Sequence, residues 1–380
     1  MTIAIDLRPL HEGYGGVAEY TRNIVKALLR NDRVNEYVLF SNSLHGQKPA
    51  LQISHPRAVH AHFRIPSKFL NARIRFLDNP QLDRMIEQKC GKHIDLFFAP
   101  NCDFFSLGKK VKKVVTLHDL SFEIYPEFLS GRSRRWHALV NPRTIALNVD
   151  HIITVSEHTR HTVLSQFDVN ENRVTSIPLG VDAPLPREQH RSIAGLPENY
   201  ILCWGSTEGR KNIPHTLRAF GRLQRRLDMR NFSCVIAGAC EGAERQKMIR
   251  VIHEYGIEEH CFFSGLVSSE ERAYLYAHAR ALVYPSFYEG FGLPPLEAAS
   301  YGIPVIVSRS SALTEIMGDS ALSVDPYNEE ELMQALMFIL QNDRVREHYR
   351  THGSQIASTY TWDRAARQTL DVFNSVTKQP

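Results

Sequence analysis

The chain has 380 residues, of which 43% are apolar and 23% charged, as is ordinary for a soluble globular protein. This length predicts two domains with sizeable cores. No apolar run approaches the roughly 18 residues of a membrane-spanning helix. Asp6 and Arg8 interrupt the apolar N-terminal segment, so no signal peptide is expected.

The net charge of +4 is unevenly distributed. Residues 1–180 hold 24 Lys and Arg against 17 Asp and Glu, whereas residues 181–380 hold 21 against 24. A basic first half favours a partner that carries phosphate or an anionic lipid headgroup. Ordinary scatter of surface charge explains the difference equally well.

The six cysteines form no C-x-x-C pair, and several lie in strand-like apolar runs. They are expected to be free thiols in a reducing compartment, which favours a cytoplasmic location. The cysteines are Cys90, Cys102, Cys203, Cys234, Cys240 and Cys261.

The first predicted elements are a buried strand at 2–6, a glycine-rich loop at 11–17 and a helix at 18–29. Together they form the opening unit of a Rossmann-like domain. The dinucleotide fingerprint G-x-G-x-x-G is absent, so Gly15 and Gly16 are interpreted as a cradle for phosphate or sugar, not for NAD. A tight turn without any ligand is an equally good explanation of the loop.

Residues 57–92 form a basic stretch interleaved with aromatic side chains, with eight Lys and Arg against three acids. The pattern suits an amphipathic surface that rests on a membrane, although a helix with a solvated charged face is the simpler explanation.

A strand at 114–118 ends at His118. Open α/β sheets bind ligands at the carboxyl ends of their strands, which favours a functional imidazole over a turn cap. The aromatic and Arg-rich segment 122–136 is expected to overhang the same edge.

A segment at 183–199 contains Pro and Gly and little periodicity, which predicts a linker. Alternation of strands and helices restarts at 200–205 and continues to a final helix at 362–376. A second α/β/α domain with parallel strands is therefore expected.

The stretch 281–307 indicates a strand, a glycine-rich loop, a helix and a further strand. Gly290 and Gly292 bracket the loop, and two prolines follow where a helix can begin. Glu289 lies in the loop and Glu297 on the helix. A loop at a helix N-terminus attracts anions, so a carboxylate there needs hydroxyl donors as partners.

Three signals occur in one order: the glycine loop after the first strand, Arg210-Lys211 after the first strand of the second half, and the E-x7-E pair Glu289 and Glu297. Together they resemble the retaining glycosyltransferases of family 4 (GT4), and the resemblance covers essentially the whole chain. The start, Ile5-Asp6-Leu7-Arg8-Pro9, is similar to members that build bacterial surface polysaccharides, often mannosyltransferases.

The resemblance implies the α/β GT-B fold, in which two Rossmann-like domains with parallel sheets face each other across a cleft. It implies an acceptor-binding domain at 1–182, a linker at 183–199 and a nucleotide-sugar domain at 200–358. A C-terminal helix at 359–380 is expected to cross back to the first domain.

The resemblance also implies a catalytic set of His118, Arg210, Lys211 and Glu289. The two cations would neutralise the leaving diphosphate, while Glu289 and His118 would face the transferred sugar and Glu297 would bind the ribose hydroxyls. The other expected substrate-binding residues are Gly15, Gly16, Asp119, Gly205, Ser206, Leu266, Gly290, Phe291, Gly292 and Leu293. Each residue alone has a structural explanation, as a solvated charge or a helix cap, but their joint order favours the site.

The expected activity is retaining transfer of a hexose to a hydroxyl of a glycan or lipid-linked glycan, with GDP-mannose as the first candidate donor. No metal or other cofactor is expected, because no Asp-x-Asp motif is present. The expected partners are a nucleotide sugar, a glycan acceptor and, peripherally, the inner face of the cytoplasmic membrane, with no nucleic acid. A sugar-nucleotide epimerase of the same fold and a non-catalytic nucleotide-sugar-binding module remain as alternatives.

Overall fold

The computed structural model describes residues 1–12, 15–44, 53–205, 208–227 and 231–378. The chain forms two compact units. Unit 1 contains Met1–Ile124, Ser130–Gly180 and Thr361–Pro380, and unit 2 contains Tyr125–Leu129 and Val181–Tyr360.

Unit 1 is built on a seven-stranded parallel sheet in the order β3-β2-β1-β4-β5-β6-β7. Most of its strands are short apolar runs buried on both faces, as expected for a parallel sheet covered by helices. The strands are β1 (Thr2–Asp6), β2 (Glu36–Asn42), β3 (Ala58–Phe63), β4 (Leu96–Ala99), β5 (Lys112–Leu117), β6 (His151–Thr154) and β7 (Val174–Ser176).

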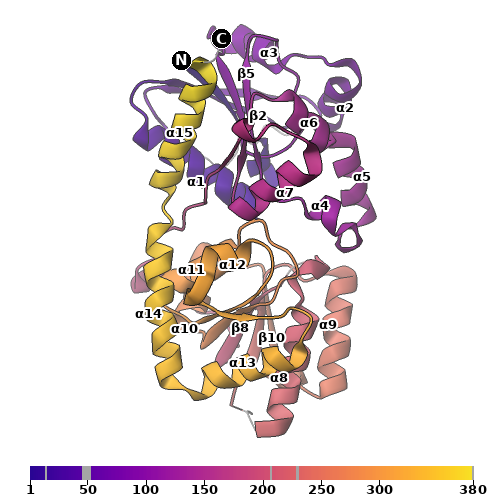
Figure 1. Cartoon of the computed structure of the whole chain (residues 1–380), viewed down its shortest axis with the longest axis vertical. Helices are drawn as coiled ribbons and strands as arrows, with labels where there is room; N and C mark the ends of the chain where they lie inside the picture. Colours follow the sequence, from indigo (N-terminus) through magenta and orange to yellow (C-terminus); the bar gives the residue numbers. More distant parts are fainter. Residues whose placement is uncertain (13–14, 45–52, 206–207, 228–230, 379–380) are drawn as a thin grey trace. The chain divides into compact units, whose positions relative to one another are not determined.

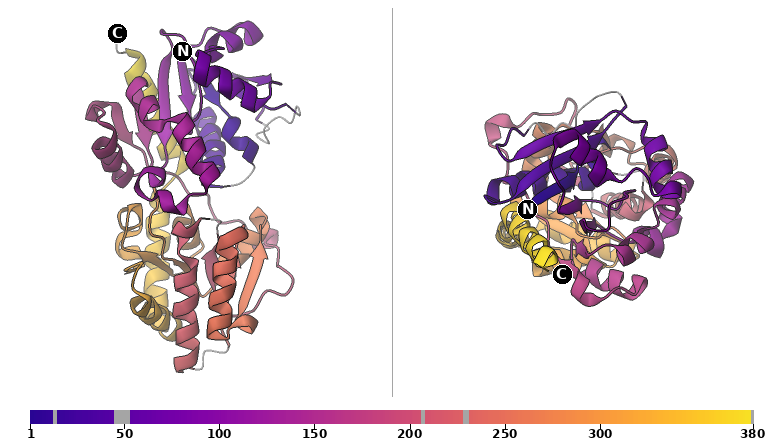
Figure 2. Two further views of the ribbon diagram at one scale, coloured as in Figure 1. Left: turned by 90° about the vertical axis from the view of Figure 1, so that its right-hand side faces the viewer. Right: turned by 90° about the horizontal axis from the view of Figure 1, so that it is seen from above.

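The helices of unit 1 come from both ends of the chain. The C-terminal helix α15 lies alongside α1 in Figures 1 and 2, and Phe373 of α15 packs edge-on against Phe98 of β4, with ring centroids 5.2 Å apart. The helices are α1 (Gly16–Asn31), α2 (Ser67–Leu77), α3 (Leu82–Cys90), α4 (Ser121–Ile124), α5 (Gly131–Val140), α6 (Pro142–Asn148), α7 (Glu157–Phe167) and α15 (Trp362–Lys378).

Unit 2 is built on a six-stranded parallel sheet in the order β10-β9-β8-β11-β12-β13. Its strands are β8 (Tyr200–Trp204), β9 (Ser233–Ala237), β10 (Cys261–Gly265), β11 (Ala281–Tyr284), β12 (Val305–Ser308) and β13 (Leu322–Val324). Its helices are α8 (Ile213–Leu227), α9 (Gly242–Tyr255), α10 (Ser269–His278), α11 (Leu293–Ser300), α12 (Ala312–Met317), α13 (Glu329–Gln341) and α14 (Asp343–Thr359).

Short 3-10 helices follow the first strand of each unit: η1 (Arg8–Glu12) after β1 and η5 (Gly209–Lys211) after β8. In each sheet the strand order also reverses at this first strand, between β1 and β4 in unit 1 and between β8 and β11 in unit 2. Open parallel sheets bind ligands at the carboxyl ends of the strands beside such a reversal. Each unit therefore has one favoured place for a ligand.

The predicted fold class, two Rossmann-like α/β units with parallel sheets, is confirmed. The basic stretch 57–92, for which a helix was the simpler expectation, is not helical throughout. Its first residues form the edge strand β3, and α2 and α3 follow. Helix α14 also went unpredicted. Residues 183–199, expected as a linker, are grouped with unit 2 and include the short 3-10 helix Arg187–Gln189.

Candidate functional site

The loop between β11 and α11 holds Glu289 in a fixed, buried place. Its side chain is only 7% exposed, and its backbone N–H donates to Ser311 Oγ at 2.8 Å. The loop ends at Gly292, the N-cap of α11, which has φ 103°. A Cβ at this position would lie 2.5 Å from Leu313 Cδ2, so only glycine fits.

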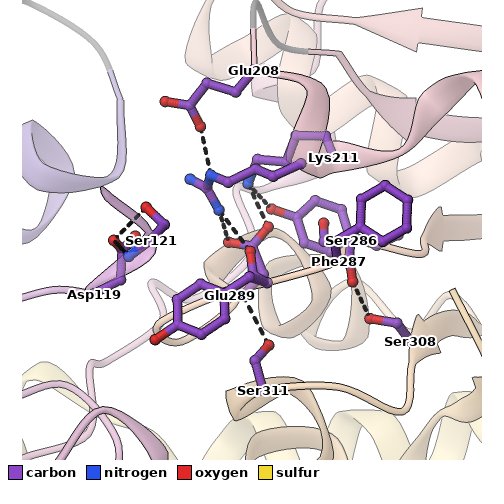
Figure 3. A network of polar contacts seen from close by, with 12 residues as sticks. Asp119, Ser121, Glu208, Lys211, Ser286, Phe287, Glu289, Ser308 and Ser311 are labelled. Carbon is purple, nitrogen blue, oxygen red and sulfur yellow. Dashed lines mark hydrogen bonds and ion pairs between the residues drawn. The ribbon is translucent and has the colours of Figure 1, made fainter. Parts of the chain in front are cut away.

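Two cations from η5 meet the Glu289 carboxylate (Figure 3). Arg210 Nη1 donates to Glu289 Oε2 at 2.9 Å and to the Tyr288 carbonyl oxygen at 2.9 Å. Lys211 Nζ donates to Glu289 Oε1 at 2.7 Å and also to the Tyr284 hydroxyl. Residues almost 80 positions apart in the sequence thus form one buried ion cluster, at the strand reversal of the unit 2 sheet.

Glu289 keeps its charge despite burial. Burial alone would raise the pKa of Glu289, but the charges of Arg210 and Lys211 outweigh it and lower the pKa to about 2. Burial and the neighbouring Arg210 lower the pKa of Lys211, while Glu289 opposes the shift. Two cations face one buried carboxylate, with the half-exposed Glu208 against Arg210 Nε at 2.6 Å. The two cations are thereby held in fixed positions that suit a phosphate.

Asn212 joins the two loops that carry the ion cluster. It has φ 58°, a left-handed conformation that asparagine tolerates well, and it is buried. Its side-chain amide donates to the carbonyl oxygens of Pro285 at 3.1 Å and Pro326 at 2.7 Å. Sequence reasoning gave this residue no role, although its place directly after Arg210-Lys211 was a usable signal.

Glu297 belongs to a second network, on α11. Its Oε2 accepts from the Tyr276 hydroxyl at 2.8 Å, and its Oε1 accepts from Arg272 Nη1 at 3.2 Å. Trp204 Nε1 in turn donates to the Tyr276 oxygen at 2.7 Å. Sequence reasoning missed these three supporting residues because they come from β8 and α10.

A cavity of about 420 Å³ lies at the carboxyl ends of β9 and β10, beside the expected substrate-binding residue Leu266. Arg245 covers the Phe263 ring at 4.4 Å, and Leu266 is 61% exposed. Gly205 allows Cys240 to lie close to the backbone, because a Cβ at position 205 would lie 2.1 Å from Cys240 Sγ. The residues lining the cavity are Gly238, Ala239, Cys240, Glu241, Arg245, Phe263, Gly265 and Leu266.

The remaining residues of unit 2 that are expected to bind substrate lie in or beside the loop between β11 and α11. Gly290 and Phe291 are buried, and Leu293 is the first residue of α11. Because Pro294 and Pro295 lack an N–H, Gly292 and Leu293 supply the backbone donors at the start of this helix. Ser206 lies outside the described residues.

His118 directly follows β5 in unit 1. Its Nε2 lies 2.8 Å from the Pro100 carbonyl oxygen and must donate to it, which leaves Nδ1 as an acceptor. The ring meets Tyr20 edge-on at 4.8 Å. Burial lowers the pKa of His118, so the imidazole is neutral near neutral pH.

The other expected residues of unit 1 occupy helix starts. Asp119 Oδ1 accepts from the Ser121 backbone N–H at 2.9 Å and from its hydroxyl at 2.7 Å, at the beginning of α4. Gly15, with φ 103°, is the N-cap of α1, and Gly16 is its first residue. A Cβ at either glycine would meet no atom within 4 Å, so both positions are open.

Within the described part of the chain, no three His, Cys, Asp or Glu side chains are arranged to hold a metal ion. The described helices also include none that is both long and apolar enough to cross a membrane.

Two family models match the chain in succession. "Glycosyltransferase Family 4" matches residues 14–184, and "Glycosyl transferases group 1" matches residues 186–355. The chain belongs to glycosyltransferase family 4. The family assignment expected from the E-x7-E pair and Arg210-Lys211 is thereby confirmed.

Similar glycosyltransferases include proteins named as mannosyltransferases. O-antigen chain mannosyltransferase B of Escherichia coli is 28% identical over 386 residues, which cover 98% of this chain and 99% of the relative. MMP alpha-(1->4)-mannosyltransferase of Mycolicibacterium hassiacum is 32% identical over 248 residues, covering 63% of this chain and 58% of the relative.

Solved structures show the same GT-B glycosyltransferase fold. Sucrose-phosphate synthase of Thermosynechococcus elongatus superimposes with a TM-score of 0.76 at 20% identity and covers both chains fully, 100% of each. HepE of Anabaena, in complex with UDP and glucose, gives a TM-score of 0.70 at 17% identity and covers 99% of this chain and 100% of HepE.

Proposed function

We propose that this glycosyltransferase moves a hexose, with retention of anomeric configuration, from a nucleoside diphosphate sugar to a hydroxyl of a glycan or lipid-linked glycan. The observation that carries the proposal is the buried cluster of Arg210, Lys211 and Glu289 at the strand reversal of unit 2. Mannose from GDP-mannose is the first candidate donor, since two similar proteins are named as mannosyltransferases of O-antigen chains. Cell-surface polysaccharide synthesis is the corresponding process.

The proposed chemistry needs charge stabilisation rather than a protein nucleophile. The bond between the sugar C1 and the phosphate oxygen breaks while the acceptor oxygen bonds to C1 on the same face. The hydroxyl proton passes to the leaving phosphate oxygen. Arg210, Lys211 and the N–H groups of Gly292 and Leu293 would stabilise the negative charge that develops on the diphosphate. Glu289 would hold the two cations in place and accept hydrogen bonds from hydroxyls of the transferred sugar.

No residue is assigned to a metal in this proposal, since the two cations and the helix start would supply the positive charge that the leaving group needs. Glu297, held by Tyr276 and Arg272, would accept the ribose hydroxyls. The cavity beside Leu266 would receive the base.

A thermal-shift screen with GDP, UDP, ADP and dTDP tests donor binding. Stabilisation by one diphosphate that is lost in Lys211→Ala supports the proposal, and no stabilisation by any of them contradicts it. Incubation of the sugar nucleotide without acceptor separates the alternatives. An epimerase makes a new sugar nucleotide, whereas a transferase gives only slow hydrolysis.

We also propose that unit 1 binds peripherally to the anionic inner face of the cytoplasmic membrane. Helices α2, α5 and α6 combine exposed apolar side chains with many Arg residues, and Arg75 Nε of α2 donates to the Leu139 carbonyl oxygen of α5 at 2.9 Å. This mixture suits an anionic lipid surface. The exposed apolar residues on these helices are Phe69, Phe76, Leu77, Trp136, Leu139 and Leu147.

Sedimentation with vesicles of phosphatidylcholine and phosphatidylglycerol tests the membrane contact. Binding that disappears at high salt, and that weakens in the double variant Phe69→Ser and Phe76→Ser, is the expected result. Absence of binding at low salt rejects this part of the proposal.

A further inference from the structure

Arg8 is a buried guanidinium whose hydrogen bonds are incomplete. Its side chain is 9% exposed and lies just after β1. Nε donates to Asp6 Oδ1 and Oδ2 at 3.0 Å, and Nη2 donates to Asp6 Oδ2 at 2.6 Å and to the Phe104 carbonyl oxygen at 2.7 Å. Nη1 has no hydrogen-bond acceptor among the described residues. Buried donors of this kind are nearly always satisfied, so Nη1 marks a place for an oxygen atom.

Asp103 supplies the second half of the same place. Its Oδ2 lies 3.8 Å from Arg8 Nη1, which is too far for a hydrogen bond. Its Oδ1 accepts from the Phe104 backbone N–H at 2.7 Å, so the carboxylate is oriented. The side chain is 19% exposed and therefore reachable from solvent. Burial raises the pKa of Asp103, and Arg8 offsets this only in part.

The two side chains lie where the strand order of unit 1 reverses. Arg8 follows β1 and Asp103 lies in the segment after β4, and these two strands are neighbours in the sheet. The corresponding reversal in unit 2, between β8 and β11, carries Arg210, Lys211 and Glu289. The two reversals therefore carry different chemistry: two cations balanced by Glu289 and Glu208 in unit 2, against one cation and two carboxylates in unit 1.

The charge balance selects the ligand class. Asp6 and Asp103 outnumber Arg8, so a diphosphate is disfavoured at the unit 1 reversal. A sugar hydroxyl is both a donor and an acceptor. One hydroxyl between the two groups can accept from Arg8 Nη1 and donate to Asp103 Oδ2, as a water molecule also can, whereas a simple anion or cation can make only one of the two contacts.

We infer that Arg8 and Asp103 form a binding site for a hydroxyl of a pyranose ring, at the carboxyl ends of β1 and β4. The identification of this pyranose with the acceptor glycan rests on the proposed function, whereas the sugar site itself does not. Arg8 is the donor, Asp103 is the acceptor, and Asp6 is a positioning residue that holds the guanidinium.

Ligand-observed saturation-transfer NMR tests the site with three probes: the methyl glycosides of α-mannose, α-galactose and β-N-acetylglucosamine. The protein is wild type, Asp103→Asn or the control Asp83→Asn. Asn at 103 keeps the acceptor for the Phe104 N–H but loses the charge that faces Arg8. Asp83 is a more deeply buried carboxylate of unit 1 that accepts from the Gly108 N–H at 3.0 Å. Each variant must keep the wild-type circular dichroism spectrum.

At least one glycoside should bind the wild type and the Asp83→Asn control, and its binding should weaken about tenfold or more in Asp103→Asn. Equal binding in Asp103→Asn, or no binding of any glycoside to the wild type, overturns the inference. Arg8→Lys gives a second reading, because it keeps the charge and removes Nη1. A nucleotide thermal shift on the same samples reports the unit 2 site separately, so failure of the proposed function is recognised independently.

Discussion

Lys211 Nζ lies 2.7 Å from Glu289 Oε1, and the two side chains are only 15% and 7% exposed. The residues come from the loops after β8 and β11, the strands at which the sheet order of unit 2 reverses. A buried carboxylate that holds Lys211 and Arg210 fixes both cations before any ligand arrives. Fixed charges of this kind need no reorganisation when negative charge develops on a leaving group.

Replacement of Glu289 by Gln should abolish most of the activity. The amide keeps the shape but leaves Arg210 and Lys211 without their carboxylate, so the cations lose their positions. We expect kcat/KM for sugar transfer to fall about 100-fold or more, a size typical of lost electrostatic preorganisation. Glu259→Gln, at an exposed carboxylate of the same unit, is the control. Activity of Glu289→Gln within a few-fold of wild type contradicts the role of this cluster.

Glu289 should also make stability depend on acidity. Its pKa is about 2 in the folded protein against an ordinary 4.5, so its contribution is complete above pH 4.5 and is lost as the pH falls toward 2. The difference in pKa corresponds to about 3 kcal/mol of unfolding free energy. Urea unfolding from pH 6 to pH 3 measures this contribution as the difference in unfolding free energy between wild type and Glu289→Gln. We expect this difference to narrow in acid, and a constant difference speaks against the pKa shift.

Tyr276 should act on nucleotide affinity through Glu297. Tyr276→Phe removes the 2.8 Å hydrogen bond to Glu297 and the acceptor for Trp204 Nε1. We expect the Kd of the preferred nucleoside diphosphate to rise several-fold in calorimetry, with little change in kcat.

A ribose analogue separates this effect from a general loss of packing. Removal of the 2′-hydroxyl should weaken the binding of the nucleotide to the wild type. In Tyr276→Phe and Glu297→Gln, the same removal should weaken nucleotide binding much less. Fully additive losses indicate that Glu297 does not accept the ribose hydroxyls.

Gly205 should be irreplaceable for steric reasons. A Cβ there would lie 2.1 Å from Cys240 Sγ and 2.9 Å from Ile236 Cγ2. Gly205→Ala should therefore cost about 1–3 kcal/mol of unfolding free energy. Gly131→Ala, at the start of α5 where a Cβ meets no atom within 4 Å, should be neutral or slightly stabilising. Equal urea midpoints for the two variants contradict the steric argument.

The sequence was informative where a strand is a buried apolar run and a loop carries a motif. Strand 2–6 was predicted with its observed ends, because it is a buried apolar run followed by a glycine-rich loop. Arg210, Lys211 and Glu289 could be named from the family motifs that they match. Their mutual hydrogen bonds could not, because these depend on β8 and β11 being neighbours.

The sequence was least informative where polar residues interrupt the pattern. The edge strand β3 has the sequence Ala-Val-His-Ala-His-Phe and is only half-buried. It was not predicted, because it lacks the continuous apolar run of a buried strand and lies within the basic stretch 57–92. Tyr276 and Arg272 lie on α10, whose sequence carries no motif, and only the tertiary structure brings them to Glu297. Arg8 was visible within the N-terminal motif, but its contact with Asp103 spans β1 and β4.

The anomeric configuration of the first product tests the central claim most directly. Proton NMR during incubation of the protein with GDP-α-mannose and a mannose-terminated, lipid-linked oligosaccharide records both the released GDP and the new anomeric signal. We predict GDP release that depends on the acceptor, an initial α-linked product, and loss of both signals in Glu289→Gln. An initial β-linked product, or equal turnover in Glu289→Gln, would contradict the account.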